Sequence, residues 1–299
     1  MARCTNPVFL TGATGFLGRR LAARLVEAGH PVFALCLPGE AAPPGVTALT
    51  GDVTDAQSVT AALAQARPTR IFHLAAVGVT DPAIPPAETC RVNVLGTLHL
   101  LEAARACDVQ RLVLVGSSFE YGARRAEELL DPLNAYGASK AAAWAYARAA
   151  YNTWSAPVVW ARPFQVYGPG QPAHALIPAA IHAARSGADF EMTAGEQQRD
   201  FIYVDDVVDG LLALAEAPAI EGRAFDLGTG QLHRLRDVIA RVWALTGATG
   251  EMRLGARPYR PGEIPALPAS VERTRRAVGW EARVGLGEGL RETVRDLAV

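Results

Sequence analysis

Two residues in the middle of the chain, Tyr136 and Lys140, are of the types that a proton-transfer site needs. They lie four positions apart at the start of an alanine-rich run that predicts a helix, so both side chains share one helix face. Lys140 is the only lysine among 29 basic residues, and the other 28 are arginines. Because a nearby ammonium favours the phenolate, it lowers the pKa of a tyrosine from about 10. The pair indicates general acid/base chemistry; the alternative is an ordinary surface lysine.

A glycine-rich turn near the N-terminus has the order of a nucleotide-binding element. An apolar strand over residues 8–10 runs into TGATGFLG, and leucines then recur at helical spacing up to Gly29. Strand, glycine turn and helix is the order of a dinucleotide fold. Gly12 permits the tight turn, Gly15 lets the backbone approach a pyrophosphate at the helix N-terminus, and Gly18 allows close helix–strand packing. We therefore predict a dinucleotide site here, against the alternative of a plain loop.

The second strand, over residues 31–37, bears on which dinucleotide is bound. NAD-binding versions of this fold usually end this strand with an acid that holds the adenosine ribose. Cys36 and Leu37 occupy that place and carry no charge. Arg19 or Arg20 at the start of the first helix could bind a 2′-phosphate instead, although both are equally compatible with solvated helix surface. NADP(H) is therefore favoured over NAD(H).

Further strands over residues 46–49, 71–76, 111–115 and 158–161 alternate with helices. This alternation predicts an α/β fold with a Rossmann-type, doubly wound parallel sheet. Asp52, after the third strand, is placed to accept a hydrogen bond from the adenine amino group, and Asp55 to cap the next helix. Ser117 and Ser118 follow the fifth strand, at the carboxyl edge where ligands of this fold bind.

Beyond the sixth strand Pro, Gly and Gln cluster, and helices, loops and short strands mix up to the C-terminus. We predict a dinucleotide-binding domain over residues 1–165, to which residues 199–230 return. Residues 166–299 form mainly a small α/β lobe that binds substrate.

Composition argues against several classes of function. With 299 residues and a net charge of −1, the chain lacks the basic excess of a nucleic-acid or anionic-membrane surface. It contains neither a signal peptide nor an apolar run long enough to span a membrane, so we expect a cytoplasmic protein. The four cysteines form no Cys-x-x-Cys pair and the histidines are scattered, which argues against a metal site or a disulfide framework. Cys90, in a helix predicted over residues 88–107, is expected to be buried.

Several segments resemble, in order, the motifs of one family: the extended short-chain dehydrogenase/reductases of the NAD-dependent epimerase/dehydratase type, which act on nucleotide sugars. The resemblance covers nearly the whole chain. Gln165 and Glu263 stand where the family has Asn and Asp. The matching segments are Thr11–Gly18, Asp52–Val53, His73–Ala76, Asn93–Thr97, Ser117–Gly122, Tyr136–Lys140, Arg162–Gly170, Arg199–Asp206 and Arg260–Glu263.

The resemblance implies an enzyme in which Tyr136 moves a proton at the sugar oxygen during hydride transfer. Lys140 would lower the pKa of Tyr136 and hold the nicotinamide ribose, and Ser117 would orient the same oxygen. Arg199 and Arg260 would clamp the substrate diphosphate. The implied cofactor contacts are Gly12, Thr14, Gly15, Phe16, Leu17, Gly18, Arg19, Asp52, Val53, Leu74, Ala75, Ala76, Asn93, Tyr136, Lys140 and Pro163. The implied substrate contacts are Ser118, Phe119, Gln165, His174, Arg199 and Arg260.

Departures from the family pattern narrow the reaction. The 4,6-dehydratases carry an Asp-Glu pair directly after the catalytic hydroxyl, where this chain has Ser118 and Phe119. Reduction of a nucleotide-linked 4-keto-6-deoxyhexose and 4-epimerisation through a transient ketone both remain. The expected use of NADP(H) favours reduction. A non-catalytic dinucleotide-binding module is a third alternative. The family often dimerises through the helices that carry Asn93 and Tyr136, so we expect a homodimer.

Overall fold

The computed structural model describes residues 6–79, 81, 83–122, 129–260 and 262–297. The chain divides into two compact units. The first unit comprises Met1–Arg162 and Leu211–Phe225, and the second comprises Pro163–Gly210 and Asp226–Val299.

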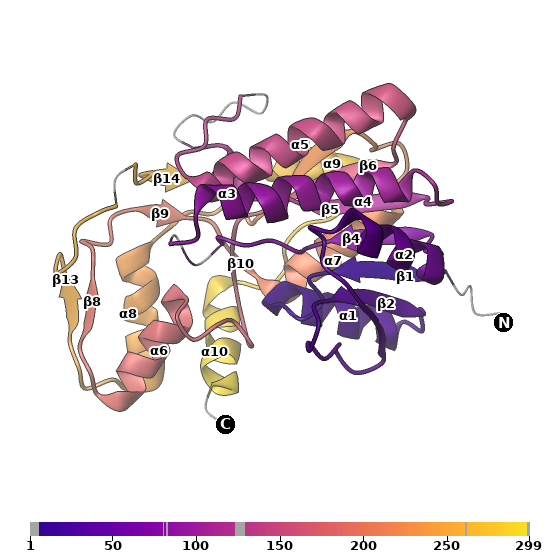
Figure 1. Ribbon diagram of the computed structural model, residues 1–299. Coiled ribbons are helices and arrows are strands. Elements are labelled where there is room, and N and C mark those ends of the chain that lie inside the picture. The colour runs from indigo at the N-terminus through magenta and orange to yellow at the C-terminus, as the bar shows by residue number, and fades with distance from the viewer. Residues whose placement is uncertain (1–5, 80, 82, 123–128, 261, 298–299) are drawn as a thin grey trace. The chain divides into compact units, whose positions relative to one another are not determined.

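A seven-stranded sheet organises the first unit, in the order β11-β6-β5-β4-β1-β2-β3 (Figure 1). The neighbours from β6 to β3 pair in parallel, and β1 lies between β4 and β2. The prediction of a Rossmann-type parallel sheet is therefore confirmed. The strands are Val8–Thr11 (β1), Val32–Cys36 (β2), Val46–Thr50 (β3), Arg70–His73 (β4), Arg111–Val115 (β5), Val158–Pro163 (β6) and Arg223–Leu227 (β11).

Helices cover the sheet because each has one apolar face. On one face, alternate strand residues such as Phe9, Ile71 and Leu112 join a buried cluster with apolar side chains of α2, α4 and α5. Figure 1 shows α4 and α5 side by side. The helices that begin within this unit are Phe16–Glu27 (α1), Ala56–Ala66 (α2), Pro86–Thr89 (α3), Gly96–Ala104 (α4) and Ala135–Trp154 (α5).

Side-chain caps fix where two of these helices begin. The carboxylate of Asp55 accepts hydrogen bonds from the backbone N–H groups of Gln57 and Ser58, which confirms the predicted cap of α2. The Asn134 side chain accepts one from the Gly137 N–H at 2.8 Å. These caps satisfy donors that would otherwise have no partner in the helix. The second cap fixes the start of α5, two residues before Tyr136.

The helix expected over residues 88–107 forms in three segments. A π-helical segment, Cys90–Leu95, separates α3 from α4. The buried side of this stretch is taken by Thr89, Asn93 and Val94, so Cys90 faces outward and is exposed. The expectation of a buried Cys90 is therefore wrong. A π-helical turn shifts the residues after it relative to an α-helix, and such segments occur frequently at functional sites.

The second unit has its own core, built from α6, α8, α10 and short strands, with Ile181, Val238 and Leu290 fully buried. Its strands pair as β10-β7, β12-β9-β14 and β13-β8. They are Gln165–Tyr167 (β7), Phe190–Met192 (β8), Gln198–Arg199 (β9), Phe201–Tyr203 (β10), His233–Arg234 (β12), Met252–Leu254 (β13) and Ala266–Leu267 (β14). The helices are Leu176–Ser186 (α6), Leu235–Thr246 (α8), Val271–Val278 (α9) and Leu286–Asp296 (α10); Val204–Glu216 (α7) runs from the second unit into the first.

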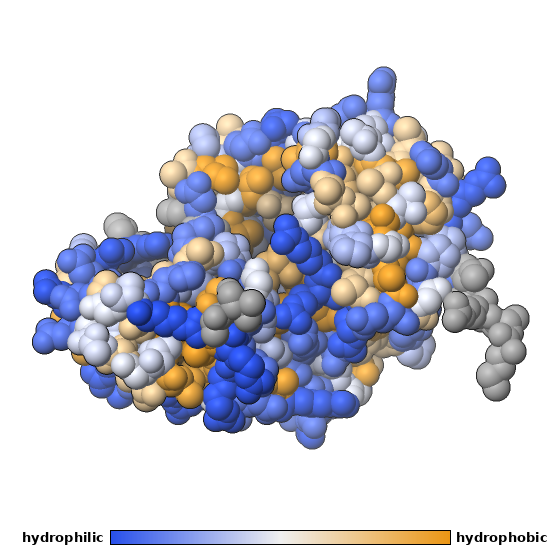
Figure 2. Space-filling view, turned by 90° about the horizontal axis from the view of Figure 1, so that it is seen from below, coloured by the Kyte–Doolittle hydropathy of each residue, from blue (hydrophilic) through white to orange (hydrophobic). Residues whose placement is uncertain are grey.

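Within the described residues, no helix combines the length and apolar character needed to cross a bilayer. On the face shown in Figure 2, hydrophilic residues are interspersed with smaller apolar areas.

Candidate active site

Tyr136 and Lys140 lie in the first two turns of α5, beside the carboxyl end of β5. Lys140 is only 3% exposed, and its Nζ donates a hydrogen bond to the Val115 carbonyl oxygen at 2.7 Å. Ser117, two residues after β5 ends, is a hydrogen-bond partner of the Tyr136 hydroxyl. The fold therefore brings the three predicted catalytic side chains together within the first unit and excludes the alternative of a surface lysine.

The protonation states of this pair depend on burial and on one nearby carboxylate. Burial raises the pKa of Tyr136 above its usual value, the hydrogen bond with Ser117 lowers it, and the charge of Glu120 raises it. Burial lowers the pKa of Lys140 to about 8, and Glu120 opposes that change. The expected lowering of the Tyr136 pKa by Lys140 is not found in the protein alone: burial has the largest effect on this pKa, and the Lys140 ammonium donates to Val115 instead.

Asn93, a predicted cofactor contact, lies in the π-helical segment and connects the loop after β4 to α5. Its Oδ1 accepts a hydrogen bond from the Val77 N–H at 2.9 Å, and its Nδ2 donates to Val77 O and Ser139 Oγ. The Ser139 hydroxyl in turn donates to the Tyr136 carbonyl oxygen at 2.8 Å. Both Nδ2 hydrogens are thus engaged, and the side chain is 1% exposed. In this structure Asn93 holds the helix that carries Tyr136.

The glycine turn has the shape that a pyrophosphate needs. Gly12 has φ +69°, and a Cβ there would lie 2.7 Å from the backbone nitrogen of Ala75. A Cβ on Gly18 would lie 2.0 Å from the Gly12 carbonyl oxygen, so the turn packs directly on α1. No side chain hydrogen-bonds to cap the N-terminus of α1 at Gly15. Its first-turn N–H groups therefore fit an anionic group, and a dinucleotide fits this cradle. The predicted contacts Thr14, Phe16 and Leu17 lie in the same turn, partly exposed.

A hydrogen-bonded histidine supports the opposite wall of this turn. His73, at the end of β4, pairs through Nδ1 with Thr11 Oγ1 at 2.7 Å and through Nε2 with Thr97 Oγ1 at 3.0 Å. Burial lowers the pKa of His73 to about 3, so its ring is neutral at physiological pH. Thr11 Oγ1 also accepts a hydrogen bond from the Ala75 N–H. β4 ends at His73 rather than continuing to Ala76, and the half-buried residues Leu74, Ala75 and Ala76 form the loop that borders the turn.

Glu40 supplies the acid that the sequence did not place at the end of β2. The chain turns back after β2, and the Glu40 N–H donates to the Leu37 carbonyl oxygen at 3.0 Å. Its carboxylate accepts hydrogen bonds from the Leu37 N–H at 3.3 Å and from Thr14 Oγ1 at 3.4 Å. An acid from the loop after β2 thus lies beside the glycine turn. The sequence signal is the Pro38-Gly39 pair, which predicts such a turn.

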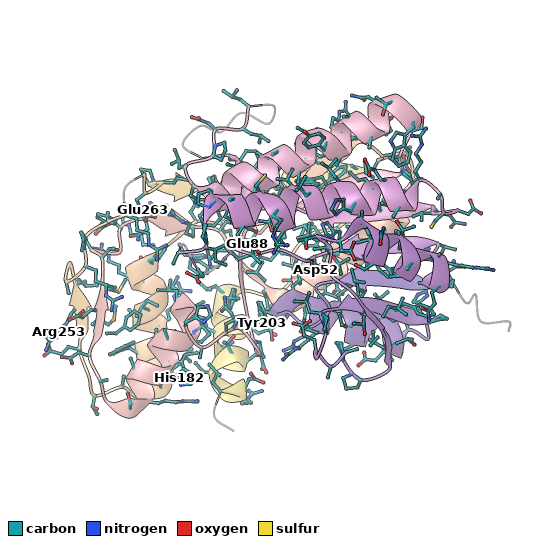
Figure 3. The ribbon with its side chains drawn as sticks, in the orientation of Figure 1. Asp52, Glu88, His182, Tyr203, Arg253 and Glu263 are labelled. Atoms are coloured by element: carbon teal, nitrogen blue, oxygen red, sulfur yellow. The ribbon has the colours of Figure 1, made fainter. Side chains whose placement is uncertain are left out.

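The other predicted cofactor contacts occupy places around the sheet edge. Asp52, labelled in Figure 3, lies half-buried between β3 and α2, and its Oδ1 accepts a hydrogen bond from the Thr54 N–H at 2.8 Å. Val53 is buried against Gly96. Arg19 is exposed on α1, and Pro163 is buried at the end of β6. Their contacts with a dinucleotide stay predictions.

The two residues after Ser117, Ser118 and Phe119, are not acidic, and Phe119 contacts the Tyr136 ring. Ser118 is 4% exposed, whereas Phe119 is 36% exposed and lies edge-on to the Tyr136 ring, with centroids 6.2 Å apart. The next residue, Glu120, is fully buried, and the sequence did not single it out as a functional residue. Its signal was the Ser-x-x-Glu spacing of a capping box, which the structure contains at Ser117 and Glu120.

Four predicted substrate contacts belong to the second unit. The Arg199 guanidinium forms an ion pair with Glu263, labelled in Figure 3, and donates to the Ile264 carbonyl oxygen at 2.7 Å. Arg260 is exposed, and its carbonyl oxygen accepts from the Glu263 N–H at 3.1 Å. His174 is exposed between β7 and α6, and Gln165 is half-buried at the start of β7. Arg199, Arg260 and Glu263 thus come from two connected segments, while His174 and Gln165 lie elsewhere in the unit.

A parallel sheet that carries both a glycine cradle and a Ser-Tyr-Lys group at its carboxyl edge defines a dinucleotide-dependent enzyme of the short-chain dehydrogenase/reductase type. The model of the family "NAD dependent epimerase/dehydratase family" matches residues 8–228. The chain belongs to this family, as its sequence motifs predicted.

Characterised relatives extend over the full length of the chain. A UDP-glucose 4-epimerase of Mycolicibacterium smegmatis is 32% identical, over 95% of this chain and 96% of that protein. The solved structure of MoeE5 in complex with UDP-glucuronic acid and NAD is 31% identical with a TM-score of 0.89, and covers 98% of this chain and 99% of that one. A UDP-glucose 4-epimerase of Thermus thermophilus, solved in complex with NAD, is 29% identical with a TM-score of 0.87, over 97% and 98% of the two chains.

Proposed function

We propose that the protein is a nucleotide-sugar 4-epimerase that retains NAD. The observation that carries the proposal is Glu40 beside Thr14 in the glycine turn. A carboxylate in this place accepts hydrogen bonds from the adenosine ribose of NAD and repels the 2′-phosphate of NADP. The expectation of NADP(H), and with it of a reductase, depended on the uncharged Cys36 and Leu37, and Glu40 removes that reason. NAD in the solved relatives supports the same choice.

The residues around Tyr136 supply what the reaction needs from the protein. The Tyr136 phenolate takes the proton of the sugar 4-hydroxyl during oxidation, and the resulting hydroxyl returns it when the ketone is reduced on its opposite face. Ser117 donates a hydrogen bond to the same oxygen and orients it. Lys140 holds a positive charge close to the tyrosine and favours its phenolate. A bound nicotinamide accepts the hydride and gives it back.

The same residues argue against two other activities. Dehydration needs a carboxylic acid directly after the catalytic hydroxyl, and Ser118 and Phe119 cannot serve. A non-catalytic dinucleotide-binding module has no use for a buried Lys140 beside Tyr136. We propose a UDP-hexose as substrate, because the relatives include a UDP-glucose 4-epimerase and a protein solved with UDP-glucuronic acid. Arg199 and Arg260 remain the proposed contacts of its diphosphate.

Cofactor content and substrate conversion test the proposal together. The purified protein is denatured, its supernatant is assayed for NAD and NADP, and the native protein is incubated with UDP-glucose or UDP-glucuronic acid without added cofactor. We expect close to one NAD per chain and conversion of one of these sugars to its 4-epimer. NADPH consumption with a nucleotide-linked 4-keto sugar, in a protein that carries no NAD, would establish the reductase instead.

We also propose a homodimer that forms through the helices carrying Asn93 and Tyr136. Both expose large apolar side chains: Leu95 is 44% exposed and Tyr146 is 49% exposed. Light scattering during size-exclusion chromatography should give twice the chain mass, and Leu95→Glu combined with Tyr146→Glu should give the monomer. A monomeric native protein would contradict the proposal.

A further inference from the structure

Glu120 is a fully buried carboxylate next to the Ser117 backbone. Its Oε1 accepts a hydrogen bond from the Ser117 N–H at 2.8 Å, and the Ser117 hydroxyl accepts one from the Phe119 N–H at 3.2 Å. This reciprocal arrangement is a capping box on a single 3-10 turn, Ser118–Glu120. The box fixes the backbone at Ser117, and therefore the direction in which its hydroxyl points.

Two side chains of β6 hold the carboxylate from the other side. Trp160 Nε1 donates to Oε1 at 3.0 Å, and Arg162 Nε donates to Oε2 at 2.7 Å. A Cβ on Gly116 would lie 2.1 Å from Trp160 Nε1 and 2.2 Å from Glu120 Oε1, so glycine is required where these groups meet. A glycine, an indole and a guanidinium thus surround this one carboxylate. Stability alone does not explain the arrangement, since buried ion pairs stabilise a core little by comparison with apolar packing.

Arg162 is held in turn by aromatic rings. Its guanidinium carbon lies 5.1 Å from the Tyr121 ring centroid and 5.7 Å from the Trp144 ring centroid. Arg162 is 3% exposed. The Glu120 carboxylate is thus paired with a fixed cation rather than left as an isolated buried charge.

The charged and titratable groups that face Lys140 come from four elements. Tyr136 precedes it on α5, His73 approaches from β4, Glu120 follows β5, and Arg162 extends from β6 towards Glu120. His73 is neutral and Tyr136 is protonated in the protein alone, so neither carries a negative charge that would stabilise the buried Lys140 ammonium. Glu120 is the group whose charge offsets the cost of burying the Lys140 ammonium.

We propose that Glu120 is a positioning residue: it fixes the Ser117 hydroxyl beside Tyr136 through the Ser117 backbone, and as a buried carboxylate paired with Arg162 it sets the electrostatic environment of Lys140. This role rests on the proposed acid/base function of Tyr136, Lys140 and Ser117, but not on which sugar is converted. Without the charge of Glu120, Lys140 loses its proton nearer to neutral pH and no longer favours the tyrosinate. The Ser117 hydroxyl and the Lys140 ammonium are thereby set by one buried carboxylate.

Because Lys140 is the only lysine of the chain, its protonation can be measured directly. Lysine labelled with carbon-13 and nitrogen-15 gives one side-chain signal, and its chemical shift against pH reports the protonation of Lys140 without substrate. We expect a midpoint near the Lys140 pKa of about 8 in the native protein. Glu120→Gln keeps an oxygen acceptor for the Ser117 N–H but removes the charge, and should lower the midpoint by about one pH unit. Glu88→Gln, on α3 (Figure 3), removes an equal charge elsewhere and should leave the midpoint unchanged.

Turnover separates this role from a loss of structure. We expect Glu120→Gln to lower kcat about tenfold or more at pH 7 with KM within about twofold, and to recover as the pH is lowered towards about 6, where Lys140 regains its proton. If Glu120→Gln does not fold, Glu120→Gln combined with Arg162→Gln removes both buried charges and should move the midpoint in the same direction. A lysine midpoint that is unchanged in the folded variant would overturn the proposal, whatever the substrate proves to be.

Discussion

Each unit of the molecule contains a carboxylate that is almost completely buried, and the two are held differently. Glu120 in the first unit pairs with a cation, Arg162, and with the N–H groups of Ser117 and Trp160. Asp200 in the second unit is 1% exposed, and its described hydrogen bonds all come from neutral donors. These are the N–H and hydroxyl of Thr229 and the N–H groups of Gly230 and Ala269.

The difference shows that burial alone does not tell what a carboxylate does. Asp200 joins three segments of the chain, namely the junction of β9 and β10, the loop after β11 and the residues before α9. Its hydrogen-bond donors are backbone N–H groups and one hydroxyl, and its charge also acts on His233, whose pKa it raises against the effect of burial. Glu120 lies beside two titratable groups in a water-poor interior, where a charge acts over a longer distance. Glu120 is proposed to set the chemistry of the catalytic side chains, whereas Asp200 mainly holds a loop of the second unit in place.

We expect the largest loss of turnover from Tyr136→Phe in the first unit, and almost none from Tyr167→Phe in the second. Burial raises the pKa of both Tyr136 and Tyr167. Tyr136→Phe should lower turnover by about 1,000-fold with NAD content retained, because the proton acceptor is lost. Tyr167→Phe, which removes only a 3.4 Å hydrogen bond to Leu286 O, should leave turnover within about twofold. Steady-state kinetics and the NAD content of both variants measure the difference. Equal losses in both variants would contradict the catalytic role of Tyr136.

Asp200→Asn should destabilise the loop after β11 and leave the protonation of Lys140 unchanged. An amide NH₂ group cannot accept the N–H groups that Asp200 accepts, so we expect unfolding by urea to show a loss of about 3 kcal/mol. The midpoint of the Lys140 signal should stay where it is in the native protein. If Asp200→Asn moves that midpoint as far as Glu120→Gln does, the distinction between the two carboxylates is wrong.

Lys140→Arg tests whether a positive charge is sufficient. The buried ammonium donates to Val115 O, and a guanidinium is wider, planar and directs its donors differently. We expect kcat/KM to fall about 100-fold although the charge is kept. The same exchange in reverse at a surface position, Arg276→Lys on α9, serves as the control and should have no effect. Native-like kinetics for Lys140→Arg would show that only charge matters there.

The smallest effect should come from Glu40, which is exposed and outside both buried groups. Glu40→Gln should weaken NAD binding about tenfold, measured by calorimetry on protein stripped of cofactor, and should narrow the preference for NAD over NADP. Glu27→Gln, exposed at the end of α1, removes the same charge as a control. A tighter NAD complex in Glu40→Gln would remove the basis for the NAD assignment.

The sheet was predictable because its strands are short apolar runs separated by turns, and the glycine turn because its spacing carries a steric meaning. Asp55 was predicted as a cap because capping needs only local chemistry. Cys90 was placed wrongly, since it was assumed to lie inside one continuous helix, whereas this stretch contains a π-helical segment and leaves Cys90 exposed. Periodicity predicts which face of a regular helix is buried, and it fails where the helix is irregular.

The two acids that proved most informative could not be placed from the sequence for different reasons. Glu40 lies in a loop, where the distance from the end of a strand depends on the turn that the chain takes. Glu120 meets Trp160 and Arg162, which are 40 and 42 residues further along the chain, a contact that only the parallel pairing of β5 and β6 creates. Motif matching gave Tyr136, Lys140 and Ser117, but not the groups that set their charge and direction.

A chain whose one lysine is buried has an unusual surface towards amine chemistry. Reagents that acylate primary amines, and enzymes that attach acetyl groups or ubiquitin to lysine side chains, find no exposed lysine in the folded protein. In the native state burial protects the Lys140 ammonium from such a reagent. The rate at which Lys140 is modified would therefore report how often α5 separates from β5. The opening of the active site would then be measured by mass spectrometry as an increase in mass.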